Sequence, residues 1–304
     1  MRPAPVFRKA VLVLAAMLSA AAACAITAPN LQSRIVIDGS TSDWQADECV
    51  FGTNADGSPQ EASNDSKLGP NLDIHQIRVT WDRANLYIAG EGIIWGNNMV
   101  IAIDASPALG LTSMGTLNSW RRNVTYPAGQ FEPEVFCATW DGNTSPRLEL
   151  LTPANSVDDR VAGPTFTAAA TFLQGESGHA MEFRIPWTTV FAYSGGVVRR
   201  DTVLAGVPDS LFFLPPFTAI RIAGFVTGGA DGTGGPDVAP NNALGCSMDL
   251  NATLSVDNFA TIIVDQDGDG LPDMGVSPSS RVVFHDSSVP TRRETWGQLK
   301  ARYH

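Results

Sequence analysis

Short stretches in which apolar and polar residues alternate run along most of the chain and predict β-strands. Residues 76–81 alternate in this way. Residues 82–85 include Asp and Asn, which favour turns, and the apolar residues 86–89 would form the returning strand. The side chains of a strand point to its two faces in turn, so this pattern predicts a β-hairpin over residues 76–90.

Similar runs predict further strands at residues 99–103, 166–172, 181–185, 220–226 and 260–264. No long window before residue 290 shows the 3.6-residue period of a helix. Many short strands separated by loops rich in Gly, Pro, Asn and Asp predict an all-β fold, an antiparallel β-sandwich of the immunoglobulin or jelly-roll kind. The loops at 52–71 and 227–250 are long for such a fold.

The first 25 residues have the pattern of a secretory signal peptide. A basic start is followed by the apolar run 10–23 and by the small residues Ala23-Cys24-Ala25, and the run is too short to span a bilayer comfortably. A lipoprotein, with Cys24 as its first mature residue, is the minority alternative. We therefore expect export to the extracellular space or cell surface, with the periplasm also open, and no membrane insertion by a later segment.

Charge and composition exclude several classes of protein. The chain has 20 basic and 31 acidic residues, a formal net charge of −11, and only 17% charged residues. Loss of the signal peptide would take the net charge to −14. Phosphate recognition needs clustered Lys and Arg, so no nucleic-acid partner is expected. The low charged fraction also argues against a disordered acidic protein.

Three cysteines, Cys49, Cys137 and Cys246, would remain in the mature chain. They allow at most one intramolecular disulfide, and the sequence does not choose among the three pairings. Three buried thiols are an equal alternative. Their spacing does not match a zinc site.

The acidic loop at residues 265–273, DQDGDGLPD, predicts a calcium site. Asp265, Asp267 and Asp269 would supply carboxylates, Leu271 its carbonyl, and Asp273 a direct or water-mediated contact. The glutamate that closes an EF-hand at position twelve is absent, and the loop resembles the calcium repeats of dockerins and thrombospondin-type linkers. We expect a weak structural Ca²⁺ site, with a dissociation constant on the order of 10⁻⁴ to 10⁻³ M.

Six phrases, in order, carry a resemblance to a known family. They are residues 35–39 (IVIDG), 43–44 (DW), 73–74 (DI), 79–88 (VTWDRANLYI), 98–104 (NMVIAID) and 182–187 (EFRIPW). Together they resemble the family 9 carbohydrate-binding modules and the related C-terminal modules of bacterial starch- and dextran-degrading enzymes. The resemblance covers roughly residues 33–265 and implies a module at 26–265: a sugar-binding β-sandwich, often with structural calcium and without catalytic activity.

The resemblance also implies where a sugar would bind. Sugar-binding members have a tryptophan in the loop before the strand that ends in Ile-Asp, and Trp95 occupies that place here. A second aromatic is expected near the C-terminal end of the domain, but residues 237–257 contain none. Trp120 and Trp140, both in polar loops, are therefore the other candidates, because indole faces stack on the C–H faces of sugars.

No motif for a catalytic nucleophile, a zinc protease or a phosphate loop is present, so we do not expect an enzyme. The leading prediction is a secreted, non-catalytic module that binds a polysaccharide or oligosaccharide, of the glucan type. One alternative is a cell-surface or matrix structural or adhesion protein that kept the sandwich without a sugar site. A less favoured one is a periplasmic haem-binding sandwich, implied by related electron carriers, with His75 and Met99 as ligands.

The C-terminal part, residues 274–304, is predicted to be a linker and a basic tail. Residues 281–284 could form a final strand within the linker. Residues 291–304 carry apolar side chains at near-helical spacing, which suits either a short docked helix or a sorting tag.

Overall fold

The structure is a computed structural model of the chain. It describes residues 31–52, 61, 65–106, 109–141, 145–170, 179–199 and 211–285. The predicted signal peptide at 1–25 and the basic tail at 291–304 lie outside the described residues.

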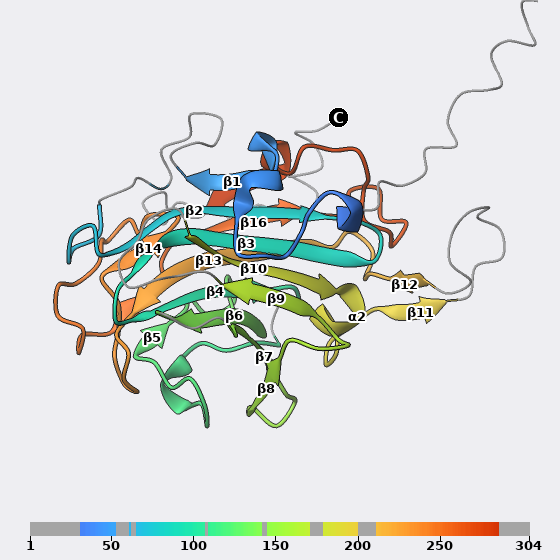
Figure 1. The fold of residues 1–304 in the computed structure, drawn as a ribbon. Coiled ribbons are helices and arrows are strands. Elements are labelled where there is room, and N and C mark those ends of the chain that lie inside the picture. Colours follow the sequence, from blue (N-terminus) through green and yellow to red (C-terminus); the bar gives the residue numbers. More distant parts are fainter. Residues whose placement is uncertain are drawn as a thin grey trace, which may run out of the picture.

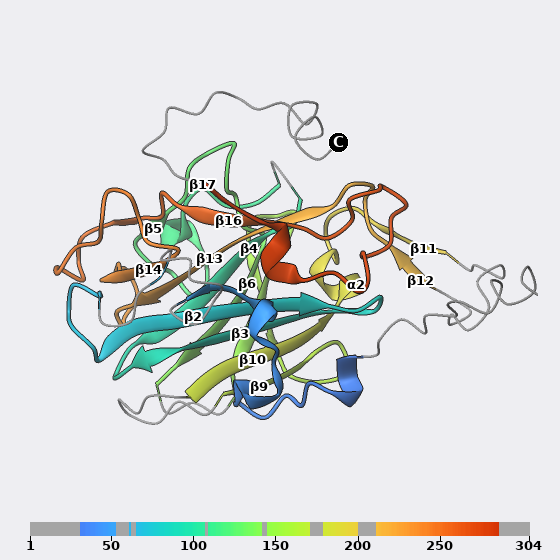
Figure 2. The same cartoon turned by 90° about the horizontal axis from the view of Figure 1, so that it is seen from above.

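Two antiparallel sheets form a β-sandwich, which confirms the predicted all-β fold. Figures 1 and 2 show the five-stranded sheet and the eight-stranded sheet as two layers packed face to face. The five-stranded sheet has the order β1 (Cys49–Gly52), β2 (Leu72–Trp81), β3 (Asn85–Ile94), β10 (His179–Pro186), β9 (Thr167–Ala170). The eight-stranded sheet has the order β17 (Val282–His285), β16 (Phe259–Ile263), β13 (Ala219–Thr227), β4 (Asn98–Asp104), β6 (Val135–Trp140), β7 (Arg147–Leu151), β8 (Val157–Val161), and β14 (Asp237–Ala239) pairs with β13.

Smaller elements connect and extend the sheets. A two-stranded ribbon, β11 (Val197–Arg199) with β12 (Leu211–Phe213), projects from one end of the sandwich (Figures 1 and 2). The other two-stranded sheet pairs β5 (Val124–Thr125) with β15 (Leu254–Ser255) in parallel. Helical elements are single turns: α2 (Trp187–Val190) and the 3₁₀ turns η1 (Leu31–Ser33), η2 (Thr41–Asp43), η3 (Ala46–Glu48), η4 (Met114–Thr116) and η5 (Pro278–Arg281).

The hairpin predicted at residues 76–90 is present, and it is longer than predicted. Strands β2 and β3 pair from Trp81↔Leu86 to Leu72↔Ile94. Their turn is fixed by Asp82, whose Oδ1 accepts the backbone N–H groups of Ala84 and Asn85, each at 2.8 Å. An aspartate that binds the backbone two residues on is a common turn former, so this local chemistry was readable from the sequence.

The main core lies between the two sheets. Its largest side chains include Trp187, Phe183 and Phe51, and it is closed by aliphatic residues of both sheets, such as Ile77 and Ile101. Each fully buried side chain of this size contributes about 1.5–3 kcal/mol relative to its exposed state.

A second apolar cluster covers the outer face of the eight-stranded sheet. Phe136 and Phe225 of the sheet pack there against Met114, Tyr126 and Phe131 of the long connection before β6. Both faces of the central strands are therefore buried, and every residue of β4 is buried. This is why β4 reads as a continuous apolar run rather than as an alternating strand.

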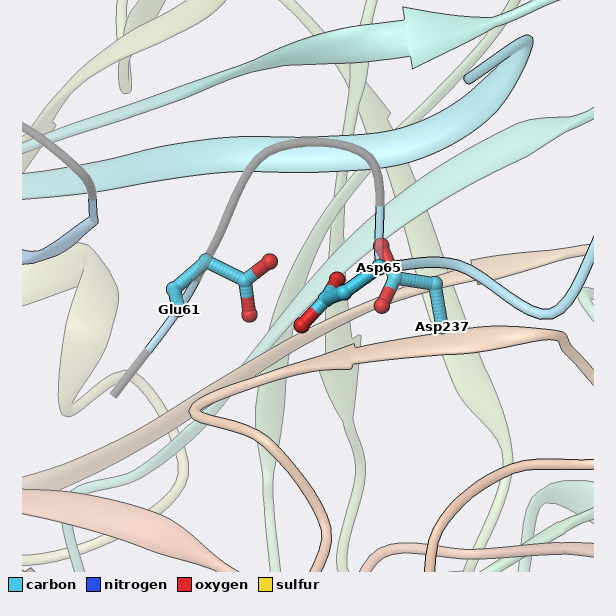
Figure 3. Close-up of side chains that lie close together, drawn as sticks. All are labelled: Glu61, Asp65 and Asp237. Atoms are coloured by element: carbon cyan, nitrogen blue, oxygen red, sulfur yellow. The ribbon is translucent and has the colours of Figure 1, made fainter. Parts of the chain in front are cut away.

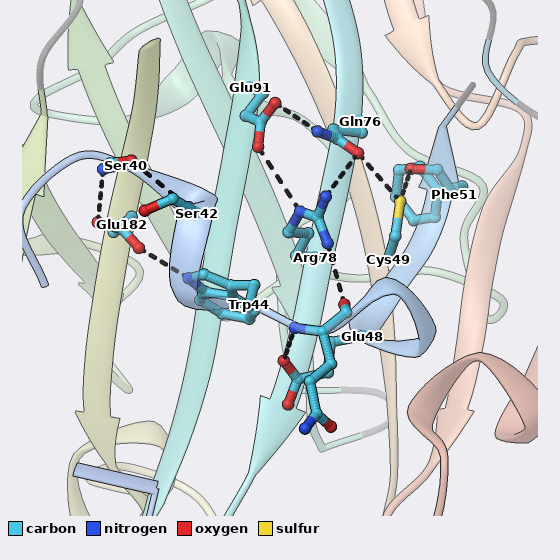
Figure 4. Close-up of polar contacts among 11 residues, drawn as sticks. Ser40, Ser42, Trp44, Glu48, Cys49, Phe51, Gln76, Arg78, Glu91 and Glu182 are labelled. Carbon is cyan, nitrogen blue, oxygen red and sulfur yellow. Dashed lines mark hydrogen bonds and ion pairs between the residues drawn. The ribbon is translucent and has the colours of Figure 1, made fainter. Parts of the chain in front are cut away.

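The N-terminal segment lies across the outer face of the five-stranded sheet (Figure 4). Trp44 packs there with Tyr87 and Ala89 of β3. The carboxylate of Glu182 on β10 accepts the Trp44 indole N–H at 2.8 Å and the backbone N–H groups of residues 38–40 at 2.6–3.1 Å. Because this buried carboxylate takes four donors, it fastens the segment to the sheet.

No disulfide joins Cys49, Cys137 and Cys246 in the described part of the chain, and two of the three match the alternative of buried thiols. Cys49 and Cys137 are buried and Cys246 is partly buried. No helix in the described part of the chain is long and apolar enough to cross a membrane.

Candidate functional site: an aromatic groove and an acidic loop

Trp120 and Trp140 lie together at one end of the eight-stranded sheet. Their ring centroids are 5.2 Å apart and their planes are inclined by 45°. Both line a groove of about 490 Å³, whose other walls include Gly96 and Asn97 in the β3–β4 turn, Asn98 at the start of β4, and Gly229 and Asp231 in the loop after β13. This volume is in the range of small-ligand sites.

Trp120 forms a fixed wall of the groove. Its φ of 54° is in the left-handed region that bulky residues rarely adopt, and its side chain is only 8% exposed. The Arg122 guanidinium carbon lies 5.3 Å from the centre of the indole, at cation–π distance. The contacts with Arg122 and Trp140 hold the ring in place.

Glu149 of β7 lies beside the indole of Trp120 and is fully buried. Its carboxyl group lies close to the Trp120 side chain, which favours the ionised form, and to the Asp159 carboxylate, which opposes it. Burial, reinforced by the nearby Asp159 carboxylate, raises the pKa of Glu149 to about 8. An acid kept neutral in this way avoids the cost of a buried charge beneath the groove.

Trp140 is the open ring of the pair. It is the last residue of β6, where the preceding five residues are buried and Trp140 is 43% exposed. The strand therefore ends by presenting an indole to solvent. Such a face can stack against the C–H groups of a sugar ring.

Trp95, the candidate implied by the resemblance, lies in the turn beside the groove. It is 54% exposed, and Gly96 and Asn97, but not Trp95, are among the residues that line the groove. The turn is fastened to the end of β6, because Gly96 N–H donates to Asp141 Oδ2 at 2.8 Å. The sequence could not place Trp120 and Trp140 near this turn, and the β4–β6 pairing does so by setting Asn98 opposite Trp140.

The charged groups of the groove largely neutralise one another. Arg122, 6% exposed, donates to Asp231 Oδ1 at 3.1 Å and to Thr227 Oγ1 at 3.3 Å. Burial lowers the pKa of Arg122, and Asp231 opposes that shift. Asp141 adds a further negative charge, while Asn98 and other amide and hydroxyl groups complete the walls. The groove therefore offers an indole face with mixed polar groups and no unpaired cation among its described residues.

The acidic loop brings together three of its predicted ligands. Asp265, Asp267 and Asp269 each offer a carboxylate oxygen, and these atoms lie within 4.8 Å of one another. Gly268 and Gly270 have φ values of 78° and 81°, a backbone that a side chain at either position would strain. The loop thus folds as a tight turn with its carboxylates on one side.

Asp265 anchors this turn from inside the protein. It is fully buried, and its Oδ2 accepts the N–H groups of Phe217 and Gly270, each at 3.0 Å. Burial raises the pKa of Asp265, and the Asp269 carboxylate raises it further. Three close carboxylates, one of them buried, are a donor set that fits a hard divalent cation such as Ca²⁺.

The other two predicted ligands are placed differently. Asp273 is not part of the three-carboxylate group, and its Oδ2 pairs with Arg281 at 2.9 Å and accepts the Gln266 N–H at 3.0 Å. Leu271 buries its side chain beside Phe213, while its N–H donates to Asp269 Oδ1 at 2.7 Å. These contacts hold the end of the loop in place.

A second acidic cluster was missed by the sequence analysis. Glu61, Asp65 and Asp237 direct carboxylates toward one another (Figure 3), with one oxygen of each within 4.8 Å of the others. Asp237 is 2% exposed and accepts the Ile74 N–H at 2.7 Å; burial raises its pKa to about 7, and Asp65 adds to that shift. No spacing could reveal this cluster, because it joins Glu61 and Asp65 to Asp237, the first residue of β14, far along the chain.

The two residues considered as haem ligands lie in different surroundings. His75 Nε2 is 3.3 Å from Asp73 Oδ2, and the His75 side chain is 20% exposed. Met99 is fully buried in the core between the sheets. These contacts give no support to a shared axial site.

No family model matches the chain, and no curated protein is detectably similar to it in sequence.

Proposed function

We propose that this protein is an exported, non-catalytic carbohydrate-binding β-sandwich. The observation that carries the proposal is the pairing of Trp120 with the half-exposed Trp140 in one groove with polar walls. An apolar face beside convergent hydrogen-bonding groups is complementary to a pyranose. Export rests on the predicted signal peptide at 1–25.

The geometry favours a single soluble chain of neutral sugars. Two indoles inclined by 45° cannot both lie flat on a crystalline polysaccharide surface, and only Trp140 is widely exposed. Arg122 is already paired with Asp231, and Asp141 adds negative charge, so a uronic-acid polymer would meet no free cation. A neutral glucan-type chain meets these conditions.

Replacing Trp140 tests the proposal. Stacking would cover about 80 Å² of the exposed indole, worth about 2 kcal/mol, so Trp140→Ala should weaken binding roughly thirty-fold. The measurement is affinity electrophoresis of the full chain through gels containing soluble α- or β-glucan, xylan, or a uronan. We expect wild-type retardation by at least one neutral polymer and its loss in Trp140→Ala.

Tyr193→Ala is the matched control. Tyr193 is also an aromatic residue with 43% of its surface exposed, as Trp140 has, but it lies beyond the other end of β6. This variant should leave retardation unchanged. Unaltered retardation of Trp140→Ala would remove the groove as the site. A folded wild-type protein that no polysaccharide retards would favour the structural or adhesion alternative.

We also propose that Ca²⁺ binds the loop of Asp265, Asp267 and Asp269 as a structural ion. With a dissociation constant on the order of 10⁻⁴ to 10⁻³ M, about 10 mM Ca²⁺ should stabilise the fold by about 1.4–2.7 kcal/mol. The thermal midpoint should then rise by about 3–10 °C relative to protein in chelator.

Asp267→Asn should remove most of this calcium-dependent rise, because it deletes a charge but keeps an oxygen to accept the Asp269 N–H. Asp249→Asn is its control, since Asp249 makes the same kind of turn with Asn251 outside the loop. An equal calcium response in Asp267→Asn and wild type would place the ion elsewhere, with the Glu61 cluster next to be tested.

A further inference from the structure

The aromatic groove has two carboxylates in its walls, and they face different surroundings. Asp141 is turned into the protein, because its Oδ1 is buried and its Oδ2 accepts the Gly96 N–H at 2.8 Å. Asp231, in contrast, has 58% of its side chain exposed. Of the two, Asp231 is therefore the carboxylate that a ligand in the groove can reach.

Two arginines next to Trp120 fix the position of this exposed carboxylate. Arg122 Nη1 donates to Asp231 Oδ1 at 3.1 Å, and Arg121 Nη2 lies 3.6 Å from Asp231 Oδ2. The Gly232 N–H also donates to the Arg121 carbonyl, at 2.8 Å, and joins the two backbones. The carboxylate therefore has a set position relative to the indole of Trp120, as a specific ligand site requires.

These contacts leave part of the hydrogen-bonding capacity of the carboxylate unused. An ionised carboxylate has two oxygens with about four acceptor positions. Arg122 occupies one position on Oδ1, and the Arg121 guanidinium lies beyond ordinary hydrogen-bond distance of Oδ2. Because the side chain of Asp231 is largely exposed, both of its oxygens can accept further hydrogen bonds from a ligand.

A carboxylate with both oxygens available matches two hydroxyls on adjacent carbons of a sugar ring. When the two hydroxyls are gauche, each can donate to one oxygen, as in other bidentate contacts with carboxylates. An isolated hydroxyl would use only one oxygen. Hydrogen bonds to a charged acceptor are about twice as strong as neutral ones, so such a pair of hydroxyls should decide which chains bind.

We propose that Asp231 binds two adjacent free hydroxyls of a sugar unit in the groove, and that the protein therefore selects 1,4- or 1,6-linked neutral chains over 1,3-linked ones. An internal unit of a 1,4-linked chain has free hydroxyls on carbons 2 and 3, and a 1,6-linked unit has them on carbons 2, 3 and 4. An internal 1,3-linked unit has no free hydroxyls on adjacent ring carbons. This inference rests on the function proposed above and adds a linkage preference to it.

Asp231→Asn in the full mature chain tests the role of the carboxylate. The asparagine oxygen can still accept the Arg122 bond, so we expect a folded protein with a thermal midpoint near that of wild type. The charge and the second acceptor are lost. Affinity for the polymer that retards wild type should therefore fall at least about tenfold in affinity electrophoresis.

Asp158→Asn is the matched control for this change. Asp158 also pairs with an arginine, since Arg160 Nη2 lies 2.7 Å from its Oδ2, but it belongs to β8 and does not line the groove. This variant should leave retardation unchanged.

The linkage preference is measured in the same gels. Dextran, pullulan and xylan present adjacent free hydroxyls along the chain, whereas laminarin, a 1,3-linked glucan, presents them only at its ends and branches. We expect wild type to be retarded by at least one of the first three polymers, and more weakly by laminarin.

The outcomes separate this inference from the proposed function. Retardation that Trp140→Ala loses and Asp231→Asn keeps would overturn the inference and leave the groove as the sugar site. Stronger retardation by laminarin than by the other three polymers would also overturn it. A folded wild type that none of the polymers retards would overturn the proposed function, and this inference with it.

Discussion

Replacing Glu182 by alanine should destabilise the protein by about 3–5 kcal/mol, because it leaves several buried N–H donors without an acceptor, at about 1–3 kcal/mol for each. Glu182 is fully buried and accepts the Gly39 N–H at 2.6 Å and the Trp44 indole N–H at 2.8 Å, both inside the protein. Without the carboxylate, the N-terminal segment would lose its attachment to β10. The measurement is urea unfolding followed by tryptophan fluorescence.

Ser40→Ala is the matched control for this change. Ser40 lies in the same segment, and its hydroxyl accepts the exposed Ser42 N–H at 3.4 Å as its one hydrogen bond within the described residues. We expect a loss within about 1 kcal/mol, the usual value of an exposed cap. Equal midpoints for Glu182→Ala and wild type would show that the four donors find other partners and that Glu182 does not fasten the segment.

The free energy of unfolding should fall as the pH rises from about 4.5 to about 8. Burial is the main cause that raises the pKa of Glu134 and Glu149 to about 8, and of Glu182 to about 7, from an ordinary 4.5. Between these values the folded chain retains protons that the unfolded chain has released. Deprotonation therefore favours unfolding, and stability present at pH 4.5 is lost through the folded pKa values.

If the pKa shifts of these three groups added up to only two units, the free energy of unfolding would fall by about 3 kcal/mol. The thermal midpoint would then fall by about 6–12 °C. Calorimetry at pH 5 and pH 9 measures this directly. The double variant Glu134→Gln, Glu149→Gln should show a smaller fall, because its amides do not titrate. A midpoint that rises from pH 5 to pH 9 would contradict the prediction.

Several elements were predictable because their signals are local. The turn at residues 82–85 carries its own hydrogen bonds, and strands β10, β13 and β16 alternate or are rich in β-branched residues. Strands β6, β7 and β8 were missed. β6 is buried along nearly its whole length and so has no alternation, and β8 is short and charged.

The sequence pattern also did not predict that the outer faces of the two sheets are buried. Thr80 of β2 alternates as a solvent-facing residue, yet it is 5% exposed, because the N-terminal segment lies over this face of the sheet. A period of two reports which residues share a face, but not what covers that face.

By itself, the sequence determined the all-β fold, most of its central strands and the acidic loop, because each depends on residues close together in the chain. Only the tertiary structure decided which candidates meet. It brings Trp120 beside Trp140, joins Glu61 to Asp237, and sets Glu134 against the chain after α2. These juxtapositions join residues up to 176 positions apart and follow from strand order and loop packing, which leave no periodic trace along the chain.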